Sequence, residues 1–119
     1  MIHTMRDEWS VFASGAYIDC RKIYAFIKNK EGYRPEKVAV RDISHKPLDA
    51  IDTASVRYLS AKHDSPVLLC FGMRNPHKKP YRMLDGRHRL LKCLNLGFDH
   101  VSAYIVPEHV SLKFVSLGG

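Results

Sequence analysis

The sequence predicts a single α+β domain in which a small mixed sheet is flanked by helices. Two observations predict this class. Some segments place apolar residues at helical spacing, and between them lie apolar runs of strand length. The chain has 119 residues, which is enough for one hydrophobic core and hardly for two. We therefore expect one domain over residues 1–119.

The first predicted helix lies in the N-terminal third of the chain. Ile23, Phe26 and Ile27 recur at the i, i+3 and i+4 spacing of one helix face. Asp19 stands before them as a candidate N-cap, and Gly32 follows as a stop. Trp9, alone in a polar N-terminal segment, is expected to anchor the core or an interface.

A strand and a short helix are predicted next. Residues 37–43 are rich in β-branched side chains and follow a proline, which favours a strand. Residues 53–63 predict a short helix whose N-cap is a polar residue at 52–53. Its apolar spacing predicts that Val56 and Leu59 face the core.

A long hairpin is predicted in the middle of the chain. Residues 66–72 form a continuous apolar run, which is typical of a strand buried on both faces. Residues 73–80 contain two prolines and an asparagine among cations, a composition typical of turns. Residues 81–84 then predict the returning strand.

The last two elements are a helix and a strand. Residues 87–96 place leucines at helical spacing, and Gly97 stands just past the predicted end. Residues 100–107 alternate apolar and polar side chains as a strand does, and a proline closes the run. Gly86 therefore marks a strand-to-helix junction.

Charge and cysteine content limit the classes of partner and compartment. Nineteen Lys and Arg against twelve Asp and Glu give a net charge of +7, which favours an anionic partner such as a nucleotide, nucleic acid or acidic surface. Three scattered cysteines without a CxxC pair are typical of a reducing cytosol. No apolar run is long enough to span a bilayer, and the first ten residues contain acids. We expect a cytoplasmic protein without a membrane partner.

The strand-to-helix junction concentrates ionisable residues, from Asp85 to Arg89. A helix N-terminus presents backbone N–H groups and about half a positive charge, and Gly86 allows a ligand to approach the backbone. Arg87, His88 and Arg89 add side-chain donors in the same turn, which together favour a phosphate. The structural alternative is a solvated basic turn in which Asp85 is only the N-cap.

The segment YRMLDGRHRLLKCLNLGFDHVSAYIVP, residues 81–107, resembles the signature of the ParB/sulfiredoxin superfamily. In that signature a hairpin strand, a Gly-x-[His/Arg]-Arg turn, a helix ending in Leu-Gly and a final strand follow one another. The resemblance implies a ParB/sulfiredoxin-like core over residues 33–107, preceded by an N-terminal helical extension over residues 1–32.

The branches of this superfamily use the turn differently. ParB proteins bind the triphosphate of CTP with Gly-Glu-Arg-Arg, and sulfiredoxins carry a reactive cysteine in Gly-Cys-His-Arg; Arg87 stands in place of both the glutamate and the cysteine. The local match is better to the Asp-Gly-His-His-Arg turn of the free serine kinase branch. That turn contacts nucleotide phosphates, and its aspartate serves a metal or catalysis.

The resemblance therefore implies a nucleotide-binding protein that takes ATP or CTP, with NTP hydrolysis or phosphoryl transfer as the possible reaction. Phosphates would be bound by Gly86, Arg87, His88 and Arg89. Asp85 would hold Mg²⁺, and Asp85 and His88 would be the catalytic residues.

Two alternatives remain open. The first is a nucleic-acid-binding module or ParB-like nuclease, in which cations of the predicted hairpin hold phosphodiesters: Arg74, Lys78, Lys79 and Arg82. The second is a non-enzymatic protein of the same fold, accessory or viral, that binds a protein partner. The histidines show no HxH, HExxH or Cys/His spacing, so no structural zinc is expected.

Overall fold

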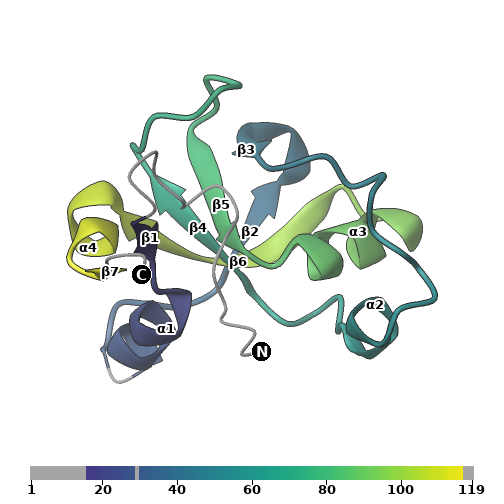
Figure 1. The fold of residues 1–119 in the computed structure, drawn as a ribbon, viewed down its shortest axis with the longest axis horizontal. Coiled ribbons are helices and arrows are strands. Elements are labelled where there is room, and N and C mark those ends of the chain that lie inside the picture. Colours follow the sequence, from purple (N-terminus) through teal and green to yellow (C-terminus); the bar gives the residue numbers. More distant parts are fainter. Residues whose placement is uncertain (1–15, 29, 117–119) are drawn as a thin grey trace.

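The computed structural model describes residues 16–28 and 30–116, and its centre is a mixed five-stranded sheet with the order β2-β6-β4-β5-β3 (Figure 1). A two-stranded ribbon pairs β1 with β7. The strands are β1 (Tyr17–Ile18), β2 (Glu36–Ala39), β3 (Ile43–Ser44), β4 (Val67–Phe71), β5 (Tyr81–Asp85), β6 (His100–Pro107) and β7 (Val115–Ser116). The helices are α1 (Cys20–Lys28), α2 (Val56–Ser60), α3 (Arg87–Asn95) and α4 (Glu108–Leu112). The α+β class is confirmed.

Strand β4 lies at the centre of the sheet. It pairs antiparallel with β5, as the predicted hairpin requires, and parallel with β6 on its other side. Four of its five residues, from Val67 to Cys70, are fully buried. The prediction of a strand covered on both faces is confirmed.

The two faces of the sheet carry separate hydrophobic cores. Because side chains alternate along a strand, Leu68 and Cys70 enter one core while Val67 and Leu69 enter the other. The first core is completed by α1 and α4, and the second by buried side chains of α3. Figure 1 shows α1 and α4 together on one side and α3 with α2 on the other.

The first and last predicted helices are confirmed. The carboxylate oxygen Oδ1 of Asp19 accepts hydrogen bonds from the backbone N–H groups of Arg21 (3.1 Å) and Lys22 (3.4 Å), as an N-cap does. Helix α3 ends at Asn95, and Gly97 follows in the left-handed conformation, φ +92°. The expectation for Trp9 lies outside the described residues.

The predicted strand over residues 37–43 is interrupted. Strand β2 ends at Ala39, a 3₁₀ turn covers Val40–Asp42, and β3 begins at Ile43. These two strands form opposite edges of the five-stranded sheet. Neighbouring strands are about 4.8 Å apart, so the two edges of a flat five-stranded sheet would be ~19 Å apart. The four residue steps from Ala39 to Ile43 span at most ~14 Å. The sheet must therefore curl, and the turn lets the chain cross from edge to edge.

The prediction for the second helix is wrong about its buried face. Helix α2 is only five residues long, and Ser55 caps it by accepting from the Tyr58 N–H at 3.2 Å. Val56 and Leu59 point to solvent, with 79% and 63% of their surface exposed. A single helical turn holds too few residues for apolar spacing to define a face. Within residues 16–28 and 30–116, none of the helices has both the length and the apolar composition of a membrane-spanning segment.

Candidate functional site

The turn between β5 and α3 is shaped by Gly86. This residue is the N-cap of α3 and has the left-handed conformation, φ +116° and ψ +21°. A Cβ built on Gly86 would lie 2.5 Å from Cγ1 of Val67 and 2.7 Å from its Cβ, both far inside van der Waals contact. The close packing of this turn on β4 therefore requires a glycine, whether or not a ligand binds.

A buried network joins the acid of this turn to one of its arginines. The Oδ2 atom of Asp85 accepts hydrogen bonds from the Tyr24 hydroxyl at 2.9 Å and from Nη2 of Arg89 at 2.8 Å. Nη1 of Arg89 donates to the backbone carbonyl of Pro66. Only 14% of the Asp85 side chain and 20% of the Arg89 side chain are exposed. The network thus ties together α1, the start of β4, the end of β5 and α3.

Protonation in this network follows from burial and from the ion pair. Burial raises the pKa of Tyr24 far above its usual value, and the negative charge of Asp85 raises it further. Burial alone would lower the pKa of Arg89, but the neighbouring oxygens of Tyr24 and Asp85 outweigh it and raise that pKa. At neutral pH the network therefore contains a neutral phenol beside a guanidinium–carboxylate pair.

The first turn of α3 also carries Arg87 and His88, and it contains no acidic residue. Both side chains are partly exposed. Nη1 of Arg87 donates to the backbone carbonyl of Pro47 at 3.3 Å. The first hydrogen bond of the helix runs from the Leu90 N–H to the Gly86 carbonyl at 2.9 Å. The backbone N–H groups of residues 87–89 therefore precede the hydrogen bonds that join successive turns of the helix.

The predicted nucleic-acid-binding cations lie at the opposite end of the same two strands. The register pairs Leu68 with Asp85 at the α3 end and Phe71 with Tyr81 at the hairpin end. The hairpin end carries the four cations Arg74, Lys78, Lys79 and Arg82. The structure therefore separates the two groups of cations, and they do not form one site.

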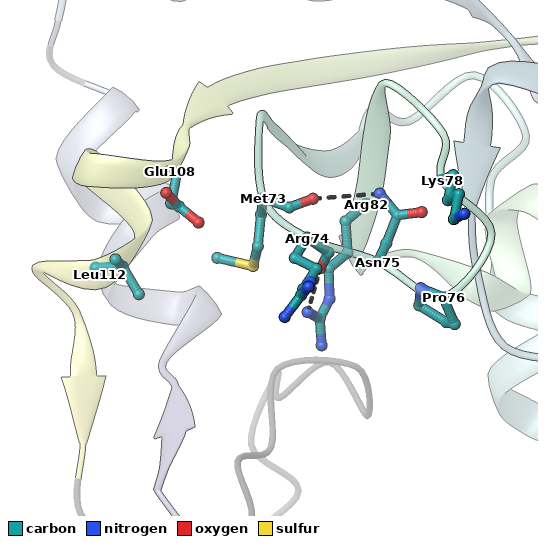
Figure 2. Close-up of a pocket in the computed structure, with 8 residues that line it drawn as sticks. All are labelled: Met73, Arg74, Asn75, Pro76, Lys78, Arg82, Glu108 and Leu112. Carbon is teal, nitrogen blue, oxygen red and sulfur yellow. Dashed lines mark hydrogen bonds between the residues drawn. The ribbon is translucent and has the colours of Figure 1, made fainter.

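Two of the hairpin cations help to hold the loop. Nη1 of Arg82 donates to the Arg74 carbonyl at 2.9 Å, a bond drawn in Figure 2, and Nζ of Lys79 donates to the Arg41 carbonyl at 2.6 Å. Arg74 and Lys78 are exposed. A phosphodiester would therefore meet Arg74 and Lys78 first.

The residues of the α3 turn do not fit a magnesium site. Asp85 is already neutralised by Arg89, and a carboxylate shared with a guanidinium is a weak ligand for a hard cation. Among residues 16–28 and 30–116, no group of three or more His, Cys, Asp or Glu side chains is arranged so that it could hold a metal ion.

Sequence reasoning missed Tyr24, whose partner Asp85 is 61 positions away in the chain. It also missed three residues near the hairpin that line a cavity with Arg74 and Arg82: Met73, Glu108 and Leu112. No local signal marks these four residues, because tertiary folding alone brings them to their partners. The pairing of Asp85 with Arg89 had no helix-face signal, because Asp85 ends β5 and the left-handed Gly86 separates it from α3.

Comparison with known proteins gives no further guide to the site. No protein-family model matches this chain, and neither the curated proteins nor the solved structures contain a match. The resemblance of residues 81–107 to the ParB/sulfiredoxin signature therefore stays a prediction.

Proposed function

We propose that this protein is a nucleotide-binding member of the ParB/sulfiredoxin superfamily that holds nucleotide phosphates at the N-terminus of α3. One observation carries the proposal: the first turn of this nine-residue helix contains Arg87 and His88 and no acid. A cation there opposes the helix dipole at a cost of about 0.3–1 kcal/mol when exposed. A phosphate bound there would attract both the cation and the positive end of the helix dipole, which offsets this cost. It would also accept hydrogen bonds from the helix amides.

The buried network supports a division of roles within the turn. We assign the ligand contacts to Arg87 and His88, together with the amides that follow Gly86. Asp85 and Arg89 are positioning residues in this proposal, because they pair with each other and with Tyr24 behind the turn. The proposal covers the binding of ATP or CTP and assigns no acceptor for phosphoryl transfer.

The order of the elements supports the superfamily part of the proposal. The superfamily signature runs from a hairpin strand through a glycine turn to a helix ending in Leu-Gly and a final strand. In this chain β5, Gly86, α3 and β6 follow one another in the same order.

Thermal unfolding in the presence of nucleotides tests the proposal. A ligand that binds only the folded state stabilises it by ~2.7 kcal/mol at a hundredfold excess over its Kd. We expect ATP or CTP to raise the Tm of the wild-type protein, and Arg87→Gln or His88→Gln to weaken binding about tenfold, the loss of one charge-assisted hydrogen bond. Arg57→Gln, an exposed cation on α2, is the matched control and should bind as wild type does.

Two outcomes would contradict the proposal. One is that no nucleotide changes the Tm. The other is that Arg87→Gln and His88→Gln bind nucleotide as Arg57→Gln does. In this test Arg89 is a poor choice for substitution, because its loss would destabilise the fold as well as any site.

Nucleic-acid binding is the second candidate, and the four cations of the hairpin end favour it. Binding through phosphodiester contacts releases counterions, so affinity should fall steeply with salt. Replacing Arg74 and Lys78 with glutamine should reduce the slope of that salt dependence by about one per contact. An unchanged slope would remove the hairpin from nucleic-acid binding.

A further inference from the structure

A cavity of about 580 Å³ lies at the hairpin end of the molecule (Figure 2). Small-molecule sites typically have volumes of ~300–1,000 Å³, so the cavity has the size of a metabolite site. One wall comes from the loop between β4 and β5 and from the start of β5, and the other from α4. The lining residues are Met73, Arg74, Asn75, Pro76, Lys78, Arg82, Glu108 and Leu112.

The α4 side of the cavity is apolar. Met73 is 6% exposed and belongs to the hydrophobic core, and Figure 2 shows its thioether directed toward α4. Leu112 faces it from α4 and keeps 45% of its surface exposed. An apolar group placed between Met73 and Leu112 would leave water and cover this surface.

The hairpin side of the cavity is cationic. Arg74, Lys78 and Arg82 line it, and among the described lining residues only Glu108 carries a carboxylate. In Figure 2 the side chains of Arg74 and Arg82 run in the same direction, next to the apolar gap. This wall favours an anionic group, and arginine presents it with paired donors.

The loop that carries these cations is held in shape before any ligand binds. The side-chain amide of Asn75 donates to the carbonyls of Lys79 (2.8 Å) and Met73 (3.2 Å), and its oxygen accepts from the Lys79 N–H at 2.9 Å. Lys78 has a left-handed backbone, φ +53°, which is uncommon for a residue other than glycine. Strained backbone of this kind persists where surrounding bonds hold it, and it is frequent at ligand sites.

We propose that this cavity binds a small organic anion that combines an apolar body with a hydrogen-bond donor. The anionic group lies against Arg74, Lys78 and Arg82. The apolar body lies between Met73 and Leu112. The donor, an amine or hydroxyl, faces Glu108, which repels a second negative charge. The cavity and the α3 turn lie at opposite ends of β4 and β5, so this site does not depend on nucleotide binding at that turn.

Anilinonaphthalene sulfonate is a suitable probe, because it has a sulfonate, two aromatic groups and an N–H donor. We expect a fluorescence titration of the full chain to show one binding site. Arg74→Gln removes one charge-assisted contact and Leu112→Glu removes part of the apolar wall, and each should raise the Kd about tenfold. N-phenylnaphthylamine, which lacks the sulfonate, should bind weakly, and inorganic sulfate should compete poorly.

Matched controls separate this site from general apolar exposure. Val56→Glu changes an exposed apolar residue on α2, and Arg57→Gln changes an exposed cation there; both should leave the Kd unchanged. The Tm of each variant, measured without probe, establishes that it is folded. Equal Kd values for Arg74→Gln, Leu112→Glu and the two α2 variants would overturn the proposal.

Glu108→Gln tests the donor part of the proposal separately. Naphthalene sulfonate resembles the probe but has no N–H group, so it meets only repulsion from Glu108. We expect Glu108→Gln to tighten the binding of naphthalene sulfonate severalfold and to change that of anilinonaphthalene sulfonate less. The same change for both compounds would show that Glu108 does not recognise a donor and would overturn this part of the proposal.

Discussion

The two ends of the β4–β5 strand pair both concentrate cations, but Arg89 at one end and Arg74 and Lys78 at the other have different surroundings. At the α3 end, Arg89 is mostly buried and bonds to Asp85 and to a backbone carbonyl. At the hairpin end, Arg74 and Lys78 are exposed beside a cavity with an apolar wall. A cation that is buried with its own acid is neutralised inside the fold, whereas an exposed cation beside a cavity is available to a ligand. The density of charge in the sequence does not distinguish these two situations.

Gly86→Ala should give the largest effect on stability. Its Cβ would overlap Val67, and its left-handed backbone would be strained, so we expect a loss of about 2–5 kcal/mol in the free energy of unfolding. Chemical denaturation measures this loss. Gly97→Ala at the other end of α3 is the matched control, because its φ is also positive but its Cβ meets nothing within 4 Å. Equal losses for both variants would show that the turn is not tightly packed on β4.

Arg89→Met should give the second largest effect. It leaves the carboxylate of Asp85 mostly buried without its cation, and we expect a loss of about 2–3 kcal/mol, less than for a fully buried pair. Adding Asp85→Asn should recover part of this loss, because the unpaired charge is then gone. Arg57→Met on α2 is the control, and a loss for Arg89→Met no larger than for this control would refute the structural role of the pair.

Tyr24→Phe should cost less, because it removes one hydrogen bond and leaves the ion pair intact. We expect a loss of about 1–2 kcal/mol at neutral pH, measured by denaturant unfolding. Tyr104→Phe is a suitable comparison, since Tyr104 is also partly buried and packs against the same core. A loss no larger than for Tyr104→Phe would mean that the hydroxyl of Tyr24 adds nothing specific.

The same tyrosine predicts a pH dependence. Burial raises the pKa of Tyr24 in the folded state, so its stabilising effect is complete below the unfolded-state pKa of ~10 and is lost as the pH rises above that value. The stability of the wild-type protein should therefore fall more steeply above pH ~10 than that of Tyr24→Phe. Parallel pH profiles for the two proteins would contradict this assignment.

Substitutions at the hairpin end should have the smallest effect on stability. Arg74→Gln and Lys78→Gln change exposed side chains, so we expect each to alter the free energy of unfolding by less than about 0.5 kcal/mol. A loss comparable to that of Arg89→Met would show that the exposed cations of the hairpin end contribute as much to stability as the buried Arg89 does.

Long or strongly patterned elements could be predicted from the sequence. Strand β4 was predictable because its continuous apolar run is of strand length and is bounded by Pro66 and Gly72, and α3 because its leucines repeat at helical spacing and Gly97 ends it. The short α2 was assigned the wrong face, since one turn carries too little periodicity. The break between β2 and β3 could not be predicted, because it depends on the curl of the whole sheet.

For the candidate sites, local sequence determined that Asp85 to Arg89 stand where a strand gives way to a helix, because period and glycine placement act over a few residues. Only the tertiary structure decided that Arg89 pairs with Asp85 beneath Tyr24, and that Leu112 comes opposite Met73 across a cavity. Burial and electrostatic partners depend on segments far apart in the chain. The packing of the two faces of the sheet therefore determines which charges are neutralised inside the fold and which face a ligand.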